Sequence, residues 1–113
     1  MDISTPLKPA ALHILIVLAE GDCHGYAIMQ AVRERSQGRV PLGTGSLYRH
    51  LAKLIDAGWV TEAPPRRPDD DPRRGTHYRL TSRGRQVLAA EKRRLIELVA
   101  AMDGLRSLRK GSA

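Results

Sequence analysis

Residues 42–58 read LGTGSLYRHLAKLIDAG, and this stretch predicts a short helix with two different faces. Apolar residues recur at the i, i+4, i+7 and i+8 positions that share one side of a helix, namely Leu47, Leu51, Leu54 and Ile55. Polar and basic residues occupy the opposite side, namely Ser46, Arg49, His50 and Lys53. One face is therefore expected to pack against the protein, and the other is free to bind a partner.

Small residues at both ends limit this helix to about three and a half turns. Thr44 or Gly45 is expected to cap the first turn, and Gly58 is expected to end the helix in the left-handed conformation. Backbone N–H groups in a first turn made of such small residues can bind an anion such as a phosphate, which the helix dipole also favours. The stretch therefore predicts a DNA recognition helix.

The composition favours a nucleic-acid partner. The 113 residues include 19 Lys and Arg against 12 Asp and Glu, a formal net charge of +7, and such a surface attracts polyanions. The length fits one domain of ordinary size. The single cysteine, Cys23, cannot form an intramolecular disulfide and fits a reducing compartment. We expect a cytoplasmic protein.

Membrane insertion and secretion are not expected. No stretch approaches the roughly 18 apolar residues of a membrane span, and His13 interrupts the most apolar run, Ala10 to Ala19. The first residues, Met1 to Ser4, lack the basic and then apolar order of a secretion signal.

The remaining elements surround the predicted recognition helix. We expect one helix that starts between Pro6 and Pro9 and runs to about Glu20, and a second from about Gly25 to near Gly38. Trp59–Thr61 and Thr76–Leu80 are bulky or alternating segments that suit the two strands of a hairpin. The order helix, helix, helix, strand, tip, strand predicts a winged helix-turn-helix.

The tip of the predicted hairpin, about residues 63–75, is rich in Pro, Asp and Arg and would form the wing. Four arginines there are expected to contact a minor groove or the DNA backbone, namely Arg66, Arg67, Arg73 and Arg74. Three aspartates, residues 69–71, repel phosphate, and folding back onto those arginines is the alternative.

A last helix is expected from Thr81, which can cap it, towards Leu105. Its apolar residues follow a heptad-like pattern, namely Leu88, Leu95, Leu98, Val99, Met102 and Leu105. Glu91 interrupts the pattern at one d position. Because the other helices already cover one another, this stripe predicts contact with a second copy. A helix lying on its own domain is the alternative.

Several of these residues together resemble the PadR family of transcriptional regulators. The resemblance covers roughly residues 7–88 and lies in Gly25-Tyr26, Gly45-Ser46-Leu47-Tyr48, Leu51 with Leu54, Ala57-Gly58-Trp59-Val60, Tyr78-Arg79-Leu80-Thr81 and Gly84. It implies a winged helix-turn-helix that binds DNA, a dimer formed through the C-terminal helix, and repression relieved by a small-molecule effector. With room for one C-terminal helix, the chain is similar to the short-tailed branch of the family.

The expected DNA-binding residues gather on the recognition helix, namely Thr44, Gly45, Ser46, Tyr48, Arg49, His50 and Lys53. Arg and Lys suit guanine edges and phosphates, and Ser and His are adaptable hydrogen-bonding groups. The family pattern also implies that the Tyr48 hydroxyl reaches a phosphate. An ordinary solvated helix face is the alternative.

Other chemistries find little support in the sequence. His13 and the pair Cys23-His24 match no common metal-ligand spacing, and no nucleophile elbow or glycine-rich phosphate loop is present. We therefore expect no metal, no cofactor and no enzymatic activity. Trp59 could line an effector pocket or simply pack in the core, and the effector-binding residues stay unassigned.

The sequence as a whole predicts a mainly α protein with a small β-hairpin. Residues 1–81 would form the winged helix-turn-helix, and residues 82–113 a dimerisation helix and basic tail. The predicted function is that of a homodimeric repressor of transcription that binds a pseudo-palindromic site in double-stranded DNA. The alternative is a winged-helix module that binds another protein and has no specific DNA site.

Overall fold

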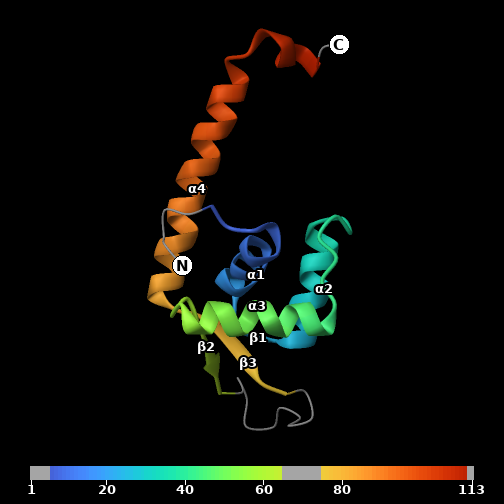
Figure 1. Ribbon diagram of the computed structural model, residues 1–113, viewed down its shortest axis with the longest axis vertical. Helices are drawn as coiled ribbons and strands as arrows, with labels where there is room; N and C mark the ends of the chain where they lie inside the picture. Colours follow the sequence, from blue (N-terminus) through green and yellow to red (C-terminus); the bar gives the residue numbers. More distant parts are fainter. Residues whose placement is uncertain (1–5, 65–74, 112–113) are drawn as a thin grey trace.

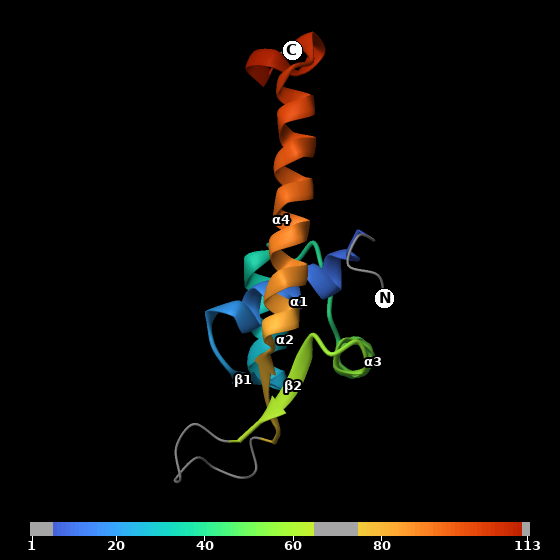
Figure 2. The ribbon, with the colours of Figure 1, turned by 90° about the vertical axis from the view of Figure 1, so that its left-hand side faces the viewer.

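The computed structural model describes residues 6–64 and 75–111. The described elements are α1 (Pro9–Glu20), β1 (Cys23–His24), α2 (Gly25–Arg35), α3 (Thr44–Asp56), β2 (Val60–Ala63), β3 (His77–Leu80), α4 (Ser82–Asp103) and the 3-10 helix η2 (Arg106–Gly111). Their order confirms the mainly α winged helix-turn-helix fold. In Figures 1 and 2, α3 runs crosswise to α4, which extends away from the other helices. The four wing arginines, Arg66, Arg67, Arg73 and Arg74, lie outside the described residues.

The sheet has three strands rather than the two that we predicted. β3 lies in the middle and pairs in antiparallel fashion with β1 and with β2. The two-residue strand β1 escaped prediction because it is too short to show an alternating pattern. Trp59 does not begin β2, because its N–H donates to the Leu54 carbonyl, 3.0 Å away, and so closes the end of α3.

The core forms where α1 meets the other elements. α1 contacts α2, α3, β3 and α4, which explains why its sequence is apolar over much of its circumference. Its side chains Ile14, Leu15 and Leu18 are almost fully buried. The other elements contribute Ile28, Val32, Leu47, Leu51, Leu54, Trp59, Val60 and Val87.

The ends of the helices agree only in part with the sequence patterns. Gly43, rather than Thr44 or Gly45, is the N-cap of α3, because the chain is still extended at Gly43 and turns helical at Thr44. Gly58 is left-handed, with φ of 80°, as predicted. α2 ends at Arg35 rather than near Gly38, since Gln37 and Gly38 both adopt positive φ and turn the chain.

α4 begins as predicted and ends two residues earlier than predicted. The Thr81 hydroxyl accepts a hydrogen bond from the Gly84 N–H, 3.0 Å away, and so caps the helix. Gly104 is the C-cap, so Leu105 lies beyond the helix. The chain then continues as η2, within the residues that the sequence assigns to a basic tail.

Gly84 is the glycine on which α4 depends most. A Cβ atom placed there would lie 2.2 Å from the Trp59 carbonyl oxygen and 2.5 Å from Leu80 Cδ1. Gly84→Ala is therefore expected to force α4 away from β2 and to lower the free energy of unfolding by about 3 kcal/mol. Thermal unfolding monitored by circular dichroism measures the loss.

Gly104→Ala is the matched control, because a Cβ atom there would meet nothing closer than 3.5 Å. Its effect should stay within about 0.5 kcal/mol. Equal stabilities of the two variants would contradict the close approach at Gly84.

Candidate nucleic-acid interface

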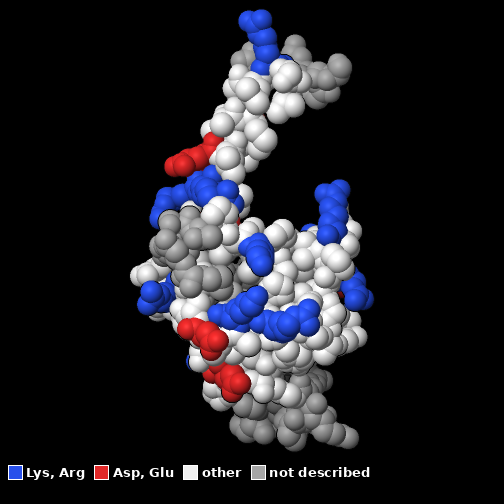
Figure 3. All heavy atoms as spheres, viewed as in Figure 1, with Lys and Arg blue, Asp and Glu red and all other residues white. Residues whose placement is uncertain are grey.

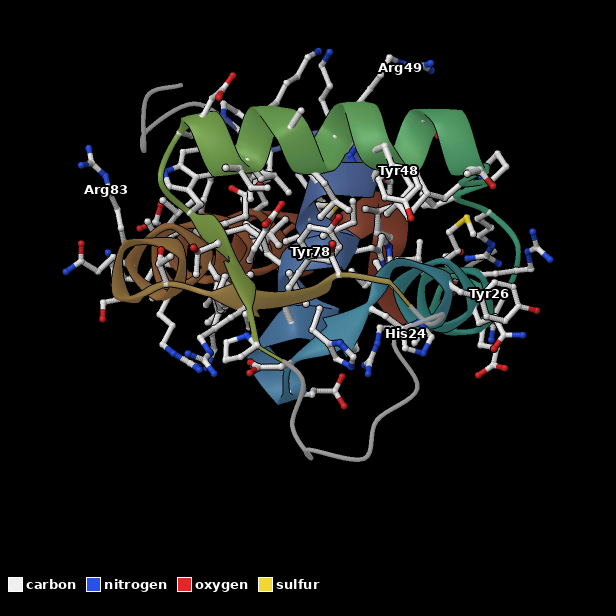
Figure 4. The ribbon with its side chains drawn as sticks, turned by 90° about the horizontal axis from the view of Figure 1, so that it is seen from below. His24, Tyr26, Tyr48, Arg49, Tyr78 and Arg83 are labelled. Atoms are coloured by element: carbon white, nitrogen blue, oxygen red, sulfur yellow. The ribbon has the colours of Figure 1, made fainter. Side chains whose placement is uncertain are left out.

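α3 has the two faces that its sequence predicts. Leu47, Leu51 and Leu54 are buried, with at most 1% of each residue exposed. Arg49 and Lys53 are exposed on the opposite side, and Figure 4 shows the Arg49 side chain pointing away from the core. Ile55, which the periodicity placed in the buried stripe, is only half-buried. The helix thus holds its cations outward on a rigid apolar base.

The N-terminus of α3 is accessible to an anion. The Gly43 cap has no side chain, and no side-chain cap hydrogen bond is formed there. Thr44 donates its hydroxyl to the sulfur of Met29, 3.9 Å away, and Ser46 donates to the Gly43 carbonyl at 3.4 Å. A Cβ atom at Gly45 would meet nothing closer than 3.6 Å. First-turn amides in this arrangement can bind a phosphate group.

Tyr48 bridges α3 and the beginning of α2. Its hydroxyl lies so close to Gly25 that a Cβ atom there would be 2.8 Å away, which explains the glycine at this position. About half of Tyr48 is exposed.

Tyr26 extends the same side of the molecule and was missed as a site residue by sequence reasoning. It is 61% exposed, and its hydroxyl accepts a hydrogen bond from Gln30 Nε2 at 3.1 Å. Figure 4 shows Tyr26 and Tyr48 at the same end of the helical layer. A large aromatic residue at an exposed helix start was the available signal.

His50 lies beside three cations. Partial burial, followed by Lys53, Lys8 and Arg49, holds the pKa of its imidazole below the ordinary value of 6.5. At neutral pH the ring is therefore uncharged, with one donor and one acceptor nitrogen. Lys8 comes from the segment before α1, and sequence reasoning missed it.

Figure 3 shows lysine and arginine side chains gathered over the outward side of α3. Arg49, Lys53 and Lys8 supply the charge that acts on His50. Arg79 of β3 is engaged differently, because its Nε and Nη2 donate to the Asp22 carboxylate at 3.1 and 2.9 Å. That pair fixes the base of the wing to the turn after α1.

The apolar side chains of α4 divide into two groups. Leu98, Val99 and Met102 are each about half exposed, as is Leu105 just beyond the helix. Leu88 and Leu95 are half-buried and line a groove of about 480 Å³ between α1 and α4, together with Leu12, Ile16, Lys92, Ile96 and Val99. α4 therefore presents a continuous apolar strip from the helical core to its free end.

Glu91 has a structural role that its place in the heptad did not reveal. It is 5% exposed and accepts two hydrogen bonds from Arg94, at 2.6 and 3.0 Å. It also accepts the backbone N–H of Leu7 at 2.9 Å. These bonds lower the pKa of the carboxyl group, with Arg94 as the larger cause. Glu91 thereby attaches the segment before α1 to α4.

Two further features concern metals and membranes. Among residues 6–64 and 75–111, no three His, Cys, Asp or Glu side chains are grouped so that they could hold a metal ion. None of the helices in the described part of the chain has the length and apolar character needed to cross a membrane.

The three helices, the small sheet and the outward-facing α3 define a winged helix-turn-helix protein. Residues 14–90 match the Transcriptional regulator PadR-like family, and the chain belongs to that family. The resemblance inferred from the sequence is thereby confirmed, and the protein is a transcriptional regulator.

Similar structures share the fold at low sequence identity. A PadR family transcription regulator from Clostridium difficile superposes with a TM-score of 0.71 at 23% identity, covering 85% of this chain and 96% of that one. The smu.1704 protein of Streptococcus mutans superposes with a TM-score of 0.70 at 23% sequence identity, covering 93% of this chain and 94% of that one. RosR of H. salinarum superposes with a TM-score of 0.59 at 25% sequence identity, covering 86% of this chain and 93% of that one.

A longer protein of Streptomyces fradiae is similar in sequence. This uncharacterized 37.1 kDa protein in transposon TN4556 is 37% identical over 89 residues, which make up 79% of this chain. The match covers 24% of that protein, so the chain corresponds to about a quarter of its length.

The attachment at Glu91 should depend on pH. The lowered pKa means that Glu91 stabilises the fold above the unfolded-state pKa and loses this effect as pH falls through its folded-state pKa. Glu91→Gln is expected to lower the free energy of unfolding by about 1 kcal/mol at pH 7. The difference from the original protein should shrink in acid, as denaturant titrations at several pH values would measure.

Glu97→Gln is the control, because Glu97 is exposed on the same helix. It removes the same charge without removing the Arg94 and Leu7 contacts. A pH-independent effect of Glu91→Gln, or an equal effect of Glu97→Gln, would contradict the role given to Glu91.

Proposed function

We propose that this regulator binds double-stranded DNA as a homodimer and represses transcription. α3 would enter the major groove, and the α3 of a second copy would enter the next major groove of a pseudo-palindromic site, about 10 base pairs away. The observation that carries the proposal is the arrangement of α3, whose leucines are buried while Arg49 and Lys53 point outward. Under the interaction-module alternative, the same basic surface would serve solubility or bind another polyanionic partner.

Each DNA-facing residue has a role that follows from its chemistry. Arg49 and Lys53 would bind guanine edges or phosphates, and Ser46 and His50 would form adaptable hydrogen bonds. The amides of Thr44 and Gly45 and the Tyr48 hydroxyl would hold phosphates and fix the position of the helix. The wing arginines, Arg66, Arg67, Arg73 and Arg74, would add contacts to the minor groove or backbone.

The second copy would pack along α4. The exposed side chains and the groove against α1 form one apolar strip, which water disfavours and a matching helix would cover. In this arrangement residues 1–81 bind DNA and residues 82–113 form the dimer, with Leu88, Leu95, Leu98, Val99, Met102 and Leu105 at the interface. We also propose that a small-molecule effector releases the protein from DNA and that the protein is cytoplasmic.

DNA binding should depend on the cations of α3. Arg49→Ala and Lys53→Ala are each expected to weaken binding about tenfold or more, because each removes a base or phosphate contact from both copies. If the dimer neutralises about eight phosphates, log K should fall with log salt at a slope near about −7, and each variant should reduce that slope. Fluorescence polarisation with a duplex selected from a random pool measures both quantities.

Arg93→Ala is the charge-matched control, because Arg93 is exposed on α4 away from α3. Its affinity should stay close to that of the original protein. Unchanged affinity in both α3 variants, or selection that recovers no preferred sequence, would support the interaction-module alternative instead.

Dimer formation should depend on the exposed part of α4. Leu98→Glu combined with Met102→Glu places two charges in the apolar strip and is expected to give a folded monomer in sedimentation velocity. Ala100→Glu is the control, since position 100 lies on the opposite side of the helix and is exposed. A double variant that sediments like the original protein would contradict an interface along α4.

A further inference from the structure

His50 is the residue of the outward side of α3 whose charge can change near neutral pH. It follows Arg49 directly and precedes Lys53 by three positions, so two cations accompany it on the same helix. His50 is half-buried, and part of the residue therefore stays at the surface that α3 presents. A titratable ring thus lies among the fixed charges of the candidate interface.

A third cation reaches His50 from a different part of the chain. Lys8, in the segment before α1, lines the same cavity as His50, Lys53 and Asp56. Asp56 is the carboxylate among these lining residues. Since Arg49 also acts on the ring, three cations outnumber one carboxylate around His50.

The position of Lys8 is fixed by the fold. The neighbouring Leu7 donates its N–H to the Glu91 carboxylate of α4 at 2.9 Å, and Arg94 donates to the same carboxylate. The segment that carries Lys8 is thereby attached to α4. The cationic surroundings of His50 therefore belong to the folded domain rather than to a loose end of the chain.

These surroundings oppose a proton on His50 in the free protein. Partial burial removes water from the imidazolium, and the three cations repel it, so the pKa lies below 6.5. A phosphate backbone on this side of α3 reverses the balance, because each phosphate attracts the imidazolium and offsets the charge of a neighbouring cation.

We propose that His50 takes up a proton from the solvent when a phosphate backbone binds the outward side of α3, so that the affinity for DNA rises as the pH falls. The inference rests on the proposed function, in which α3 faces DNA. The neutral ring donates one hydrogen bond and accepts one, whereas the protonated ring donates from both nitrogens and carries a positive charge. Because the coupling is reciprocal, the proton strengthens DNA binding by the factor by which DNA strengthens proton binding.

The direction of the pH dependence follows from proton counting. The complex holds more protons than the free protein, so the affinity is constant at high pH and rises as the pH falls through the pKa of His50 in the complex. It levels off below the pKa of His50 in the free protein. Because a dimer carries two copies of His50, the affinity at about pH 6 should exceed that at about pH 8.5 by about tenfold.

Fluorescence polarisation with the selected duplex measures this ratio at fixed ionic strength, since salt alone changes the affinity. His50→Gln is the decisive variant, because the amide keeps one donor and one acceptor function but takes up no proton in this range. Its ratio between the two pH values should be close to one. A constant loss of affinity caused by the substitution cancels in the ratio.

His24→Asn is the matched control, because it removes an imidazole that lies outside α3. His24 Nδ1 accepts the Ala27 N–H and caps α2, and asparagine can cap a helix in the same way. This variant should keep the rise in affinity at low pH. A ratio near one in the original protein, an unchanged rise in His50→Gln, or a rise that disappears in His24→Asn would each overturn the proposal.

Nuclear magnetic resonance observes the proton at His50 itself. The pKa of His50 should rise when the duplex is bound, and also with inorganic polyphosphate, which has phosphates but no bases. In the free protein, Lys8→Gln should raise the pKa of His50, whereas Lys92→Gln should not, because Lys92 is exposed on α4. An unchanged His50 titration in the complex would overturn the proposal, and His50→Gln assigns the signal.

The same measurements separate this inference from the proposed function. If the duplex binds with an affinity that does not depend on pH, the proposed function stands and the proton uptake is overturned. If no duplex binds, the proposed function fails together with the effect on DNA affinity. The polyphosphate titration then decides whether phosphates on α3 bring a proton to His50.

Discussion

Thr81 holds the end of the outward helix to the beginning of the long C-terminal helix. Its N–H donates to the Trp59 carbonyl at 3.0 Å, and its hydroxyl donates to the Gly58 carbonyl at 2.7 Å. The same hydroxyl oxygen accepts the Gly84 N–H. Gly84 allows the close approach, because a side chain there would collide with Trp59. The direction of α4 relative to α3 is thus set within a few residues, and both proposed surfaces depend on it.

A second attachment joins the same two parts of the molecule from the other side. Glu91 holds the segment before α1, and that segment lies beside the end of α3. α4 is therefore connected to the neighbourhood of α3 through Thr81 at its first turn and through Glu91 further along. Contacts made along α4 are therefore linked to the end of α3 through both attachments.

The helices whose apolar residues repeat with one clear period could be predicted from the sequence. The leucines of α3 repeat with the helical period because one face packs, and the Thr81 cap was visible because its side chain suits that role. Features that depend on distant partners could not be predicted. β1 exists only because β3 lies beside it. Glu91 interrupted the heptad pattern without explanation, because its partner Leu7 is far away in sequence. Lys8 lies beside His50 through folding alone.

The length of α4 gives small movements at its base a large effect. Its 22 residues span about 33 Å at about 1.5 Å per residue. A rotation of about 5° at the Thr81 end would displace the far end by about 3 Å, roughly the rise of one base pair along DNA. α4 would act as a lever in a dimer joined along it. The stiffness of the attachments at Thr81 and Glu91 would then determine how much variation in half-site spacing such a dimer tolerates.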